Sequence, residues 1–241
     1  MQSVDVSYKE VLINFIEFLK VQEEIKNTSI CLIDYVEKKF SYITQNDLFL
    51  CGYSVEEVER LGIHFFDNVL YPDDKHLFET INKIAYNFFS NQTTPQNRKN
   101  YWASYDLRFI NKNGTVKMLH FMFRPLVMDS NGNPIICLIQ ACLSGKSQSG
   151  NLCIYSTKDH QFFEYSNSTR KFIPVKRKKL NESEKQVLIL LSQGFIGKEI
   201  ANKLSKKENT IKYYFSSIHR KLNVSNNNEA VYLYANYGHL L

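Results

Sequence analysis

The 241-residue sequence contains no apolar run approaching the ~20 residues that a helix needs to cross a bilayer. Its N-terminus, MQSVDVSYKE, lacks the basic stretch, apolar core and small-residue cleavage site of an export signal. The five cysteines are odd in number and form no CxxC pair, which argues against a disulfide framework or a zinc site. These absences predict a cytoplasmic protein with reduced thiols, no membrane segment and no metal centre.

Catalytic signatures are missing as well. The sequence has no glycine-rich phosphate loop, no G-x-S-x-G nucleophile elbow and no H-E-x-x-H metal-binding helix. It has no visible 20–50-residue repeat, which argues against solenoids and propellers. Hydrophobic residues make up 44% of the chain and charged residues 22%, as in ordinary globular proteins. We therefore expect a folded protein of one or two domains that is not an enzyme.

The net charge of +6 is unevenly distributed along the chain. Residues 1–169 carry 16 Lys and Arg against 19 Asp and Glu, whereas residues 170–223 carry 14 against 4, a net charge of +10. A mildly acidic body followed by a compact basic segment predicts a polyanion-binding module toward the C-terminus. Charge alone leaves nucleic acid, an anionic membrane surface and a merely solvated face open as explanations.

The N-terminal part of the chain predicts an amphipathic helix followed by an α+β domain. Apolar residues recur at helical spacing through residues 4–25. Residues 104–143 contain three antiparallel strands, separated by the turn Asn113–Gly114 and by a second turn at 129–134. Polar and basic residues then indicate a linker that contains a small hairpin. The expected domains are a helix at 1–27, an α+β domain at 28–143, a linker at 144–179 and a helical domain at 180–241.

Short patterns within residues 28–143 resemble those of PAS domains. Residues 52–58 (GYSVEEV) and 71–74 (YPDD) are similar to the family's GYS-x-E-E-L helix and its later H-P-D-D, with Tyr71 where many members have His. Residues 105–114 resemble the family's next strand and turn, and residues 124–132 resemble the strand and turn after that. The resemblance implies a sensory or dimerising α+β domain, an antiparallel sheet with short helices, whose fold does not name its ligand.

Nothing in the PAS-like segment requires a cofactor. None of the cysteines lies in the Asn-Cys-Arg-Phe-like context that flavin photosensing needs. Haem needs an axial ligand, and we interpret the candidates His64, His76 and His120 as surface or hydrogen-bonded structural histidines. The many Phe, Tyr and Met side chains leave two interpretations open. They line a small cavity for an apolar ligand, or they simply form the core.

Residues 180–238 predict four helices. Capping boxes at 181–184 and 226–229 mark the start of the first and fourth helices. A short helix at 198–204 and a longer one at 210–222 lie between them, which is a helix-turn-helix arrangement. Together with the local charge of +10, this arrangement predicts that the polyanion is double-stranded DNA.

The same segment resembles the LuxR-type helix-turn-helix family along its whole length. The sequence departs from the family at Ile196–Gly197, where Ser-Asn is usual, at Lys206–Lys207, where Ile-Ser is usual, and at Tyr214, which replaces His. The resemblance implies a transcription regulator that binds DNA as a homodimer, with RNA polymerase as a further partner. The matching residues are Leu180, Glu184, Val187, Leu188, Leu190, Leu191, Gly194, Lys198, Glu199, Ile200, Ala201, Thr210, Ile211, Lys212, Ile218, Lys221, Leu222, Val224, Glu229 and Ala230.

The third of these helices presents the candidate DNA contacts. Five residues opposite its apolar stripe follow i, i+3, i+4, i+7 and i+11 spacing and are predicted to reach base edges in the major groove. They are Asn209, Lys212, Tyr213, Ser216 and Arg220, and the resemblance implies the same role for the central three. A second set is predicted to lie over phosphates. It consists of Lys198, Lys206, Lys207, Thr210 and Lys221.

Two apolar surfaces are candidates for a homodimer interface, although packing within one chain is an alternative use of each. They are formed by Leu12, Phe15, Ile16 and Leu19 of the first helix and by Val231 and Tyr234 of the last helix. The sequence thus favours a one-component, sequence-specific transcription regulator whose PAS-like domain senses a signal or dimerises. The alternative is a PAS-based interaction adaptor with a basic tail that binds nucleic acid without sequence preference.

Overall fold

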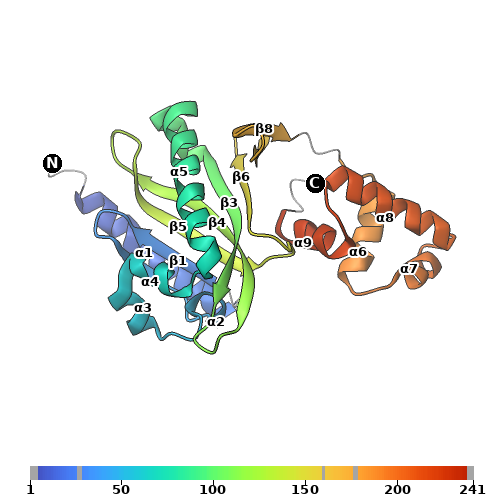
Figure 1. Cartoon of the computed structure of the whole chain (residues 1–241), viewed down its shortest axis with the longest axis horizontal. Coiled ribbons are helices and arrows are strands. Elements are labelled where there is room, and N and C mark those ends of the chain that lie inside the picture. The colour runs from blue at the N-terminus through green and yellow to red at the C-terminus, as the bar shows by residue number, and fades with distance from the viewer. Residues whose placement is uncertain (1–4, 26–28, 159–160, 176–178, 238–241) are drawn as a thin grey trace. The chain divides into compact units, whose positions relative to one another are not determined.

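The computed structural model describes residues 5–25, 29–158, 161–175 and 179–237 (Figure 1). The chain divides into two compact units, residues 1–174 and 175–241. The first unit contains α1 (Asp5–Ile25), β1 (Ser29–Asp34), β2 (Lys39–Ile43), α2 (Asp47–Leu50), α3 (Val55–Leu61), η1 (Gly62–His64), α4 (Phe65–Val69), η2 (Pro72–Asp74), α5 (Lys75–Gln92), η3 (Pro95–Asn100), β3 (Tyr101–Ile110), β4 (Val116–Met128), β5 (Pro134–Leu143), β6 (Gly150–Ser156), β7 (Gln161–Ser166) and β8 (Lys171–Val175). The second contains α6 (Glu182–Ser192), α7 (Gly197–Lys203), α8 (Glu208–Leu222) and α9 (Asn227–Tyr237).

The strands of the first unit form one sheet in the order β2-β1-β5-β4-β3-β6-β7-β8. The pairs from β2 to β7 are antiparallel, and β3, β4 and β5 occupy the three strands predicted for 104–143. Gly114, at a φ of +83°, makes the tight turn between β3 and β4 that Asn113–Gly114 predicted. The α+β class predicted for this part of the chain is therefore confirmed.

Strand β1 explains why the sheet is covered on both faces. Successive side chains of a strand point to opposite faces, so Cys31 and Ile33 enter the main core while Leu32 faces the other side. The main core lies between the sheet and the helices α2 to α5. On the other face, Leu19 of α1 packs with Leu32 and Ile136. Helix α1 is thus a layer of the domain (Figure 1).

The predicted linker is wrong over most of its length, because residues 150–175 are strands β6 to β8. Strand β6 pairs with β3, and Leu152 and Ile154 are buried in the main core. Strand β7 completes the predicted small hairpin with β6. Phe172 of β8 packs against Phe88 of α5, with ring centroids 4.8 Å apart. The segment is polar overall, so its composition did not show that single apolar residues within it pack on strands and helices distant in sequence.

The second unit has the four helices that the sequence predicts. The capping box of α6 is complete: the Asn181 side chain accepts from the Glu184 N–H at 2.9 Å, and Glu184 accepts from the Asn181 N–H at 2.8 Å. At α9, Asn226 accepts from the Glu229 N–H at 2.9 Å, but Glu229 accepts from the Ser225 N–H. The helices enclose a small apolar core of Val187, Leu188, Ile200, Ala201, Ile211, Ile218, Leu222, Ala230 and Leu233.

Candidate nucleic-acid interface and sensor cavity

Helix α8 presents the predicted base-reading residues as one exposed stripe. Its buried side consists of Ile211, Ser217, Ile218 and Leu222. All five predicted residues are exposed, and Tyr213 is exposed over 63% of its surface. The five are Asn209, Lys212, Tyr213, Ser216 and Arg220. This arrangement presents hydrogen-bonding side chains and two positive charges on the exposed side of α8, the groups that recognise bases in a DNA groove.

The acid Glu184 fastens α8 to the start of α6. Its carboxylate is buried and accepts from the Ser217 hydroxyl at 2.7 Å and from the Lys221 ammonium at 2.6 Å, besides the Asn181 N–H. Burial acts to raise the pKa of Glu184, but the bonds from Lys221, Asn181 and Ser217 outweigh burial and hold this pKa below its ordinary value. The ionised carboxylate therefore fixes the orientation of the exposed stripe.

This contact corrects one of the predicted phosphate contacts. The Lys221 side chain is only 19% exposed, and its ammonium group binds Glu184 and the carbonyl oxygen of Lys179. An ammonium held by a buried carboxylate is not available to neutralise a phosphate, so Lys221 has a structural role. The partners are 37 residues apart in sequence, and no local pattern indicates the pair.

The other predicted phosphate contacts stay on the surface. Lys198, Lys206 and Lys207 are exposed, and Thr210 is half-buried. Among the residues that the structure describes, these three lysines have no ion-pair partner. Lys207 is the N-cap of α8 and makes no side-chain capping bond, as the loss of the usual serine predicts. The first turn of α8 therefore leaves backbone N–H groups beside two lysines.

Ser216 has a hydrogen-bonding restriction that its sequence position did not show. Its hydroxyl donates to the carbonyl oxygen of Lys212 at 3.1 Å, one turn earlier in α8. While that bond is kept, Ser216 offers only its oxygen lone pairs to a partner. In the major groove such an acceptor matches the amino groups of adenine or cytosine.

The predicted dimer residues of α1 are partly used within the chain. Leu19 is buried, so this residue is corrected to an intramolecular contact, while Leu12, Phe15 and Ile16 pack half-buried on the same face of the sheet. The opposite side of α1 carries three apolar residues among polar ones such as Asn14 and Glu17. Ile13, Phe18 and Val21 are exposed there. On α9, Val231 and Tyr234 are half-buried.

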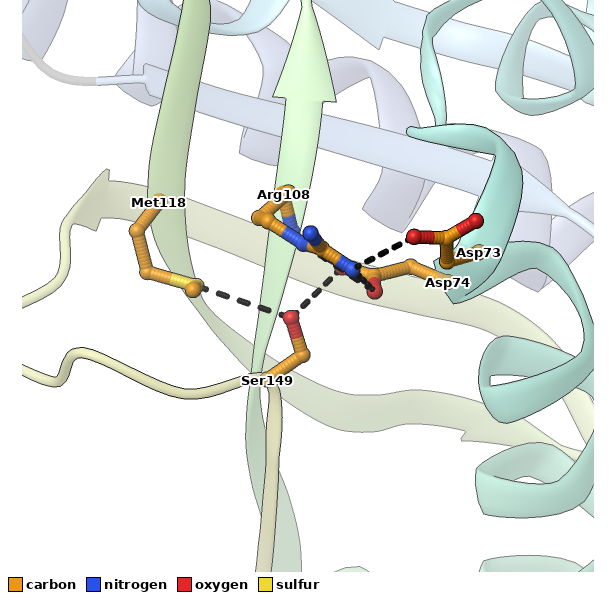
Figure 2. Close-up of polar contacts among 5 residues, drawn as sticks. All are labelled: Asp73, Asp74, Arg108, Met118 and Ser149. Atoms are coloured by element: carbon orange, nitrogen blue, oxygen red, sulfur yellow. Dashed lines mark hydrogen bonds and ion pairs between the residues drawn. The ribbon is translucent and has the colours of Figure 1, made fainter.

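The YPDD pattern builds an ion pair that joins three segments of the first unit (Figure 2). Asp74, buried at the start of α5, accepts from the Arg108 guanidinium at 2.6 Å and from the Arg108 N–H at 2.7 Å. The Ser149 hydroxyl donates to Asp74 at 2.6 Å. Asp73 lies 3.8 Å from Arg108 and is exposed. The Asp74 carboxylate thus connects α5 to β3 and to the segment before β6.

The first unit contains a cavity of about 300 Å³ between α5, η3 and strands β3 to β5. Its walls are largely aromatic and apolar, which fits the interpretation that Phe, Tyr and Met side chains line a small apolar cavity. Sequence reasoning missed Arg98 at this cavity, because nothing in residues 95–100 marks the role. The lining residues are Tyr35, Asn82, Ala85, Tyr86, Phe89, Ser90, Arg98, Ala103, Tyr105, Phe123, Pro125, Met128, Gly132, Asn133 and Pro134.

The three candidate histidines named from the sequence are surface or hydrogen-bonded residues. His64 is exposed and pairs with Asp67 at 3.1 Å, and His76 is exposed. His120 is buried, with its Nδ1 2.8 Å from Asp106. Within the described residues, no three His, Cys, Asp or Glu side chains are grouped so as to hold a metal ion. None of the described helices is long and apolar enough to span a membrane.

Residues 178–234 match the family described as GerE, bacterial regulatory proteins, luxR family. The second unit is therefore a LuxR-type helix-turn-helix domain, and the LuxR-type resemblance is confirmed. No curated protein matches the chain.

Solved structures with a likeness to the chain include two of VqmA from Vibrio cholerae. One, described as a complex with ligand and DNA, is 14% identical, with 92% of this chain and 87% of that chain covered and a TM-score of 0.34. The other, a dimer in the absence of target DNA, is 13% identical, with 92% and 88% covered and a TM-score of 0.36. A PAS domain from Colwellia psychrerythraea is 18% identical, with 53% and 97% covered and a TM-score of 0.38.

Proposed function

We propose that this chain is a one-component transcription regulator, in which the LuxR-type unit binds specific double-stranded DNA and the PAS-like unit senses a signal. The observation that carries the proposal is the stripe of five exposed polar and basic side chains on α8 of a luxR-family domain. The second helix of a helix-turn-helix enters the major groove with such a face. DNA as the target places the protein in the cytoplasm, and the function needs no catalytic step.

The decisive experiment selects duplexes from a random-sequence pool with the full-length protein and footprints the selected sequence. We expect one protected site that is bound at least ~10³-fold more tightly than random duplex at physiological salt. Equal binding to every duplex would contradict specific recognition and support the interaction adaptor with a non-specific basic tail. Transcription in vitro from a promoter that carries the selected site tests RNA polymerase as a partner.

We also propose that the regulator is a homodimer on an inverted repeat with half-sites ~10 bp apart. Helix α1 supports this proposal because its inner side lies on the sheet while Ile13, Phe18 and Val21 stay between 52% and 59% exposed. Large apolar side chains that stay exposed on a helix favour burial against a partner. A second copy offers the same three side chains, and Val231 and Tyr234 of α9 provide a further contact when both copies bind DNA.

Point variants test the dimer better than truncation, because α1 covers Leu32 and Ile136. Phe18→Glu places a charge among the exposed apolar side chains of α1, and we expect light scattering to give the mass of a monomer. Lys20→Ala changes an exposed residue of the same helix and should leave the dimer intact. A dimer that persists in Phe18→Glu contradicts the α1 interface. A monomeric wild type that protects a single half-site contradicts the dimer altogether.

A further inference from the structure

The cavity of the first unit limits the size of a ligand. Its volume of about 300 Å³ lies at the low end of the ~300–1,000 Å³ range of ligand pockets. A single ring with short substituents suits that volume better than a tricyclic or macrocyclic cofactor. Phe89 of α5 and Tyr105 and Phe123 of the sheet all line the space. Rings of this kind stack edge-to-face or offset on an aromatic ligand.

The charge of the lining limits the ligand further. Among the described residues that line the cavity, Arg98 is the single charged side chain. The carboxylate of Asp129 lies outside the lining, where it accepts hydrogen bonds from Asn133 and Asn131 and interacts electrostatically with Arg98. Inside the cavity, a cationic ligand would meet no carboxylate among the described lining residues, whereas an anionic one would meet a guanidinium.

Arg98 is held in place before any ligand arrives. Its Nε donates to the carbonyl oxygen of Phe89 at 3.0 Å, and its Nη1 donates to the carbonyl oxygens of Asn131 at 3.2 Å and Gly132 at 2.7 Å. Gly132 permits this close approach, since a Cβ there would lie 2.7 Å from Pro95 and 3.1 Å from Nη1. In the described part of the chain, Nη2 has no hydrogen-bond partner. A fixed guanidinium with a free nitrogen is a preorganised site for a carboxylate.

The Tyr105 phenol adds a neutral polar group to the wall. Tyr105 is 6% exposed, and burial raises the pKa of its hydroxyl, so the group stays protonated at physiological pH. A protonated phenol donates a hydrogen bond and accepts one. It therefore suits a hydroxyl or carbonyl substituent on a ligand ring.

We propose that the cavity binds a small aromatic monocarboxylate, with its ring among Phe89, Tyr105 and Phe123 and its carboxylate on Arg98. This inference rests on the proposed sensory role of the first unit and names the class of signal. Binding would bring a carboxylate to Nη2 of Arg98. Through its other nitrogens, Arg98 also connects the end of α5 to the turn between β4 and β5. The ligand would thereby stiffen the joint between α5 and the sheet.

Calorimetric titration of the full-length protein with benzoate, phenylacetate and the uncharged isostere benzamide tests the proposal. We expect at least one of the two acids to bind at least tenfold more tightly than benzamide. Arg98→Gln should remove that preference, whereas Lys99→Gln, which changes the exposed neighbouring cation, should keep it. Because Arg98→Gln also loosens a turn, Ala85→Leu provides a second test by filling the cavity while leaving Arg98 in place. This variant should bind neither acid.

Three results would overturn the proposal. They are benzamide binding as tightly as the acids, acid binding unchanged in Arg98→Gln or Ala85→Leu, and no binding of either acid at millimolar concentration. Footprinting of the selected DNA site separates this failure from failure of the proposed function. Loss of acid binding with the footprint retained rejects the ligand class alone, whereas absence of any specific footprint rejects the regulator.

Discussion

Phe88 and Phe89 are adjacent in α5 but contact different parts of the first unit. Phe89 lines the cavity, whereas Phe88 packs on Phe172 of β8 at 4.8 Å and on Phe163 of β7 at 5.9 Å. The two rings meet edge-on, with centroids 5.9 Å apart. Strand β8 ends at Val175, where the chain passes into the DNA-binding unit. Helix α5 therefore links the cavity wall to the strand that precedes this unit.

The first prediction concerns this link. In Phe172→Ala, we expect faster amide hydrogen exchange in residues 161–166 and 171–175, because the variant lacks the ring that packs β8 on Phe88. Exchange in β4 and β5 should stay unchanged. An aromatic acid in the cavity should slow exchange in β8 of the wild type but not of the variant. Ile173→Ala, at an exposed neighbouring position, is the control. Equal effects of the acid in both proteins would contradict transmission through Phe172.

The second prediction concerns recognition of bases. Lys212→Ala and Ser216→Ala should each weaken binding to the selected site by ~1–3 kcal/mol, because each removes a side chain that bonds a base edge, with little change on random duplex. Gel-shift titrations on the two duplexes measure the difference. Lys185→Ala is a matched control, because Lys185 pairs with Glu182 on the surface of α6. Equal weakening on both duplexes would mean that the two side chains touch only the DNA backbone.

The third prediction concerns phosphate contacts. Lys206→Ala and Lys207→Ala should weaken binding to every duplex and each reduce the slope of log affinity against log salt by about 1. Lys203→Ala is the control, since its ammonium lies 4.2 Å from the ring centroid of Phe195. An unchanged salt dependence in both variants would show that the start of α8 stays away from the phosphates.

The fourth prediction concerns Glu184. Glu184→Gln should lower the free energy of unfolding of the second unit by about 2–3 kcal/mol, because Lys221 no longer has a charged partner. Hydrogen exchange across α6 and α8 measures this change, with the exposed Glu182→Gln as control. Because the pKa of Glu184 is lowered in the folded state, its stabilisation is complete above the ordinary pKa of ~4.3. It is lost as pH falls through the lowered value. In Glu184→Gln this acid-dependent component should disappear.

The fifth prediction concerns the Asp74–Arg108 pair. Asp74→Asn should destabilise the first unit by about 3 kcal/mol, because a buried carboxylate that holds Arg108 and Ser149 is replaced. Trp102, the only tryptophan of the chain, lies in β3 and reports urea unfolding of this unit by fluorescence. The exposed Asp73→Asn should change stability by less than about 0.5 kcal/mol. Similar destabilisation in both variants would mean that the effect comes from the change in net charge and not from the buried ion pair.

The sequence by itself determined the features that depend on near neighbours. Capping at Asn181 and Asn226, the turn at Gly114 and the exposed stripe of α8 follow from interactions or spacings within a few residues, so the local pattern was sufficient. For the same reason, the two fold classes and the LuxR-type unit were predictable.

Only the tertiary structure decided the features that depend on distant partners. Lys221 is removed from the phosphate contacts by Glu184, 37 residues away, and Asp74 meets Ser149 across 75 residues. Strand β6 joins the sheet through β3, and Leu19 is buried because Leu32 and Ile136 lie beneath it. Composition and periodicity show that a side chain is apolar or charged. They do not show which distant surface the side chain contacts. That contact decided whether Leu19 lies in the core or at a dimer interface, and whether Lys221 forms an ion pair or a DNA contact.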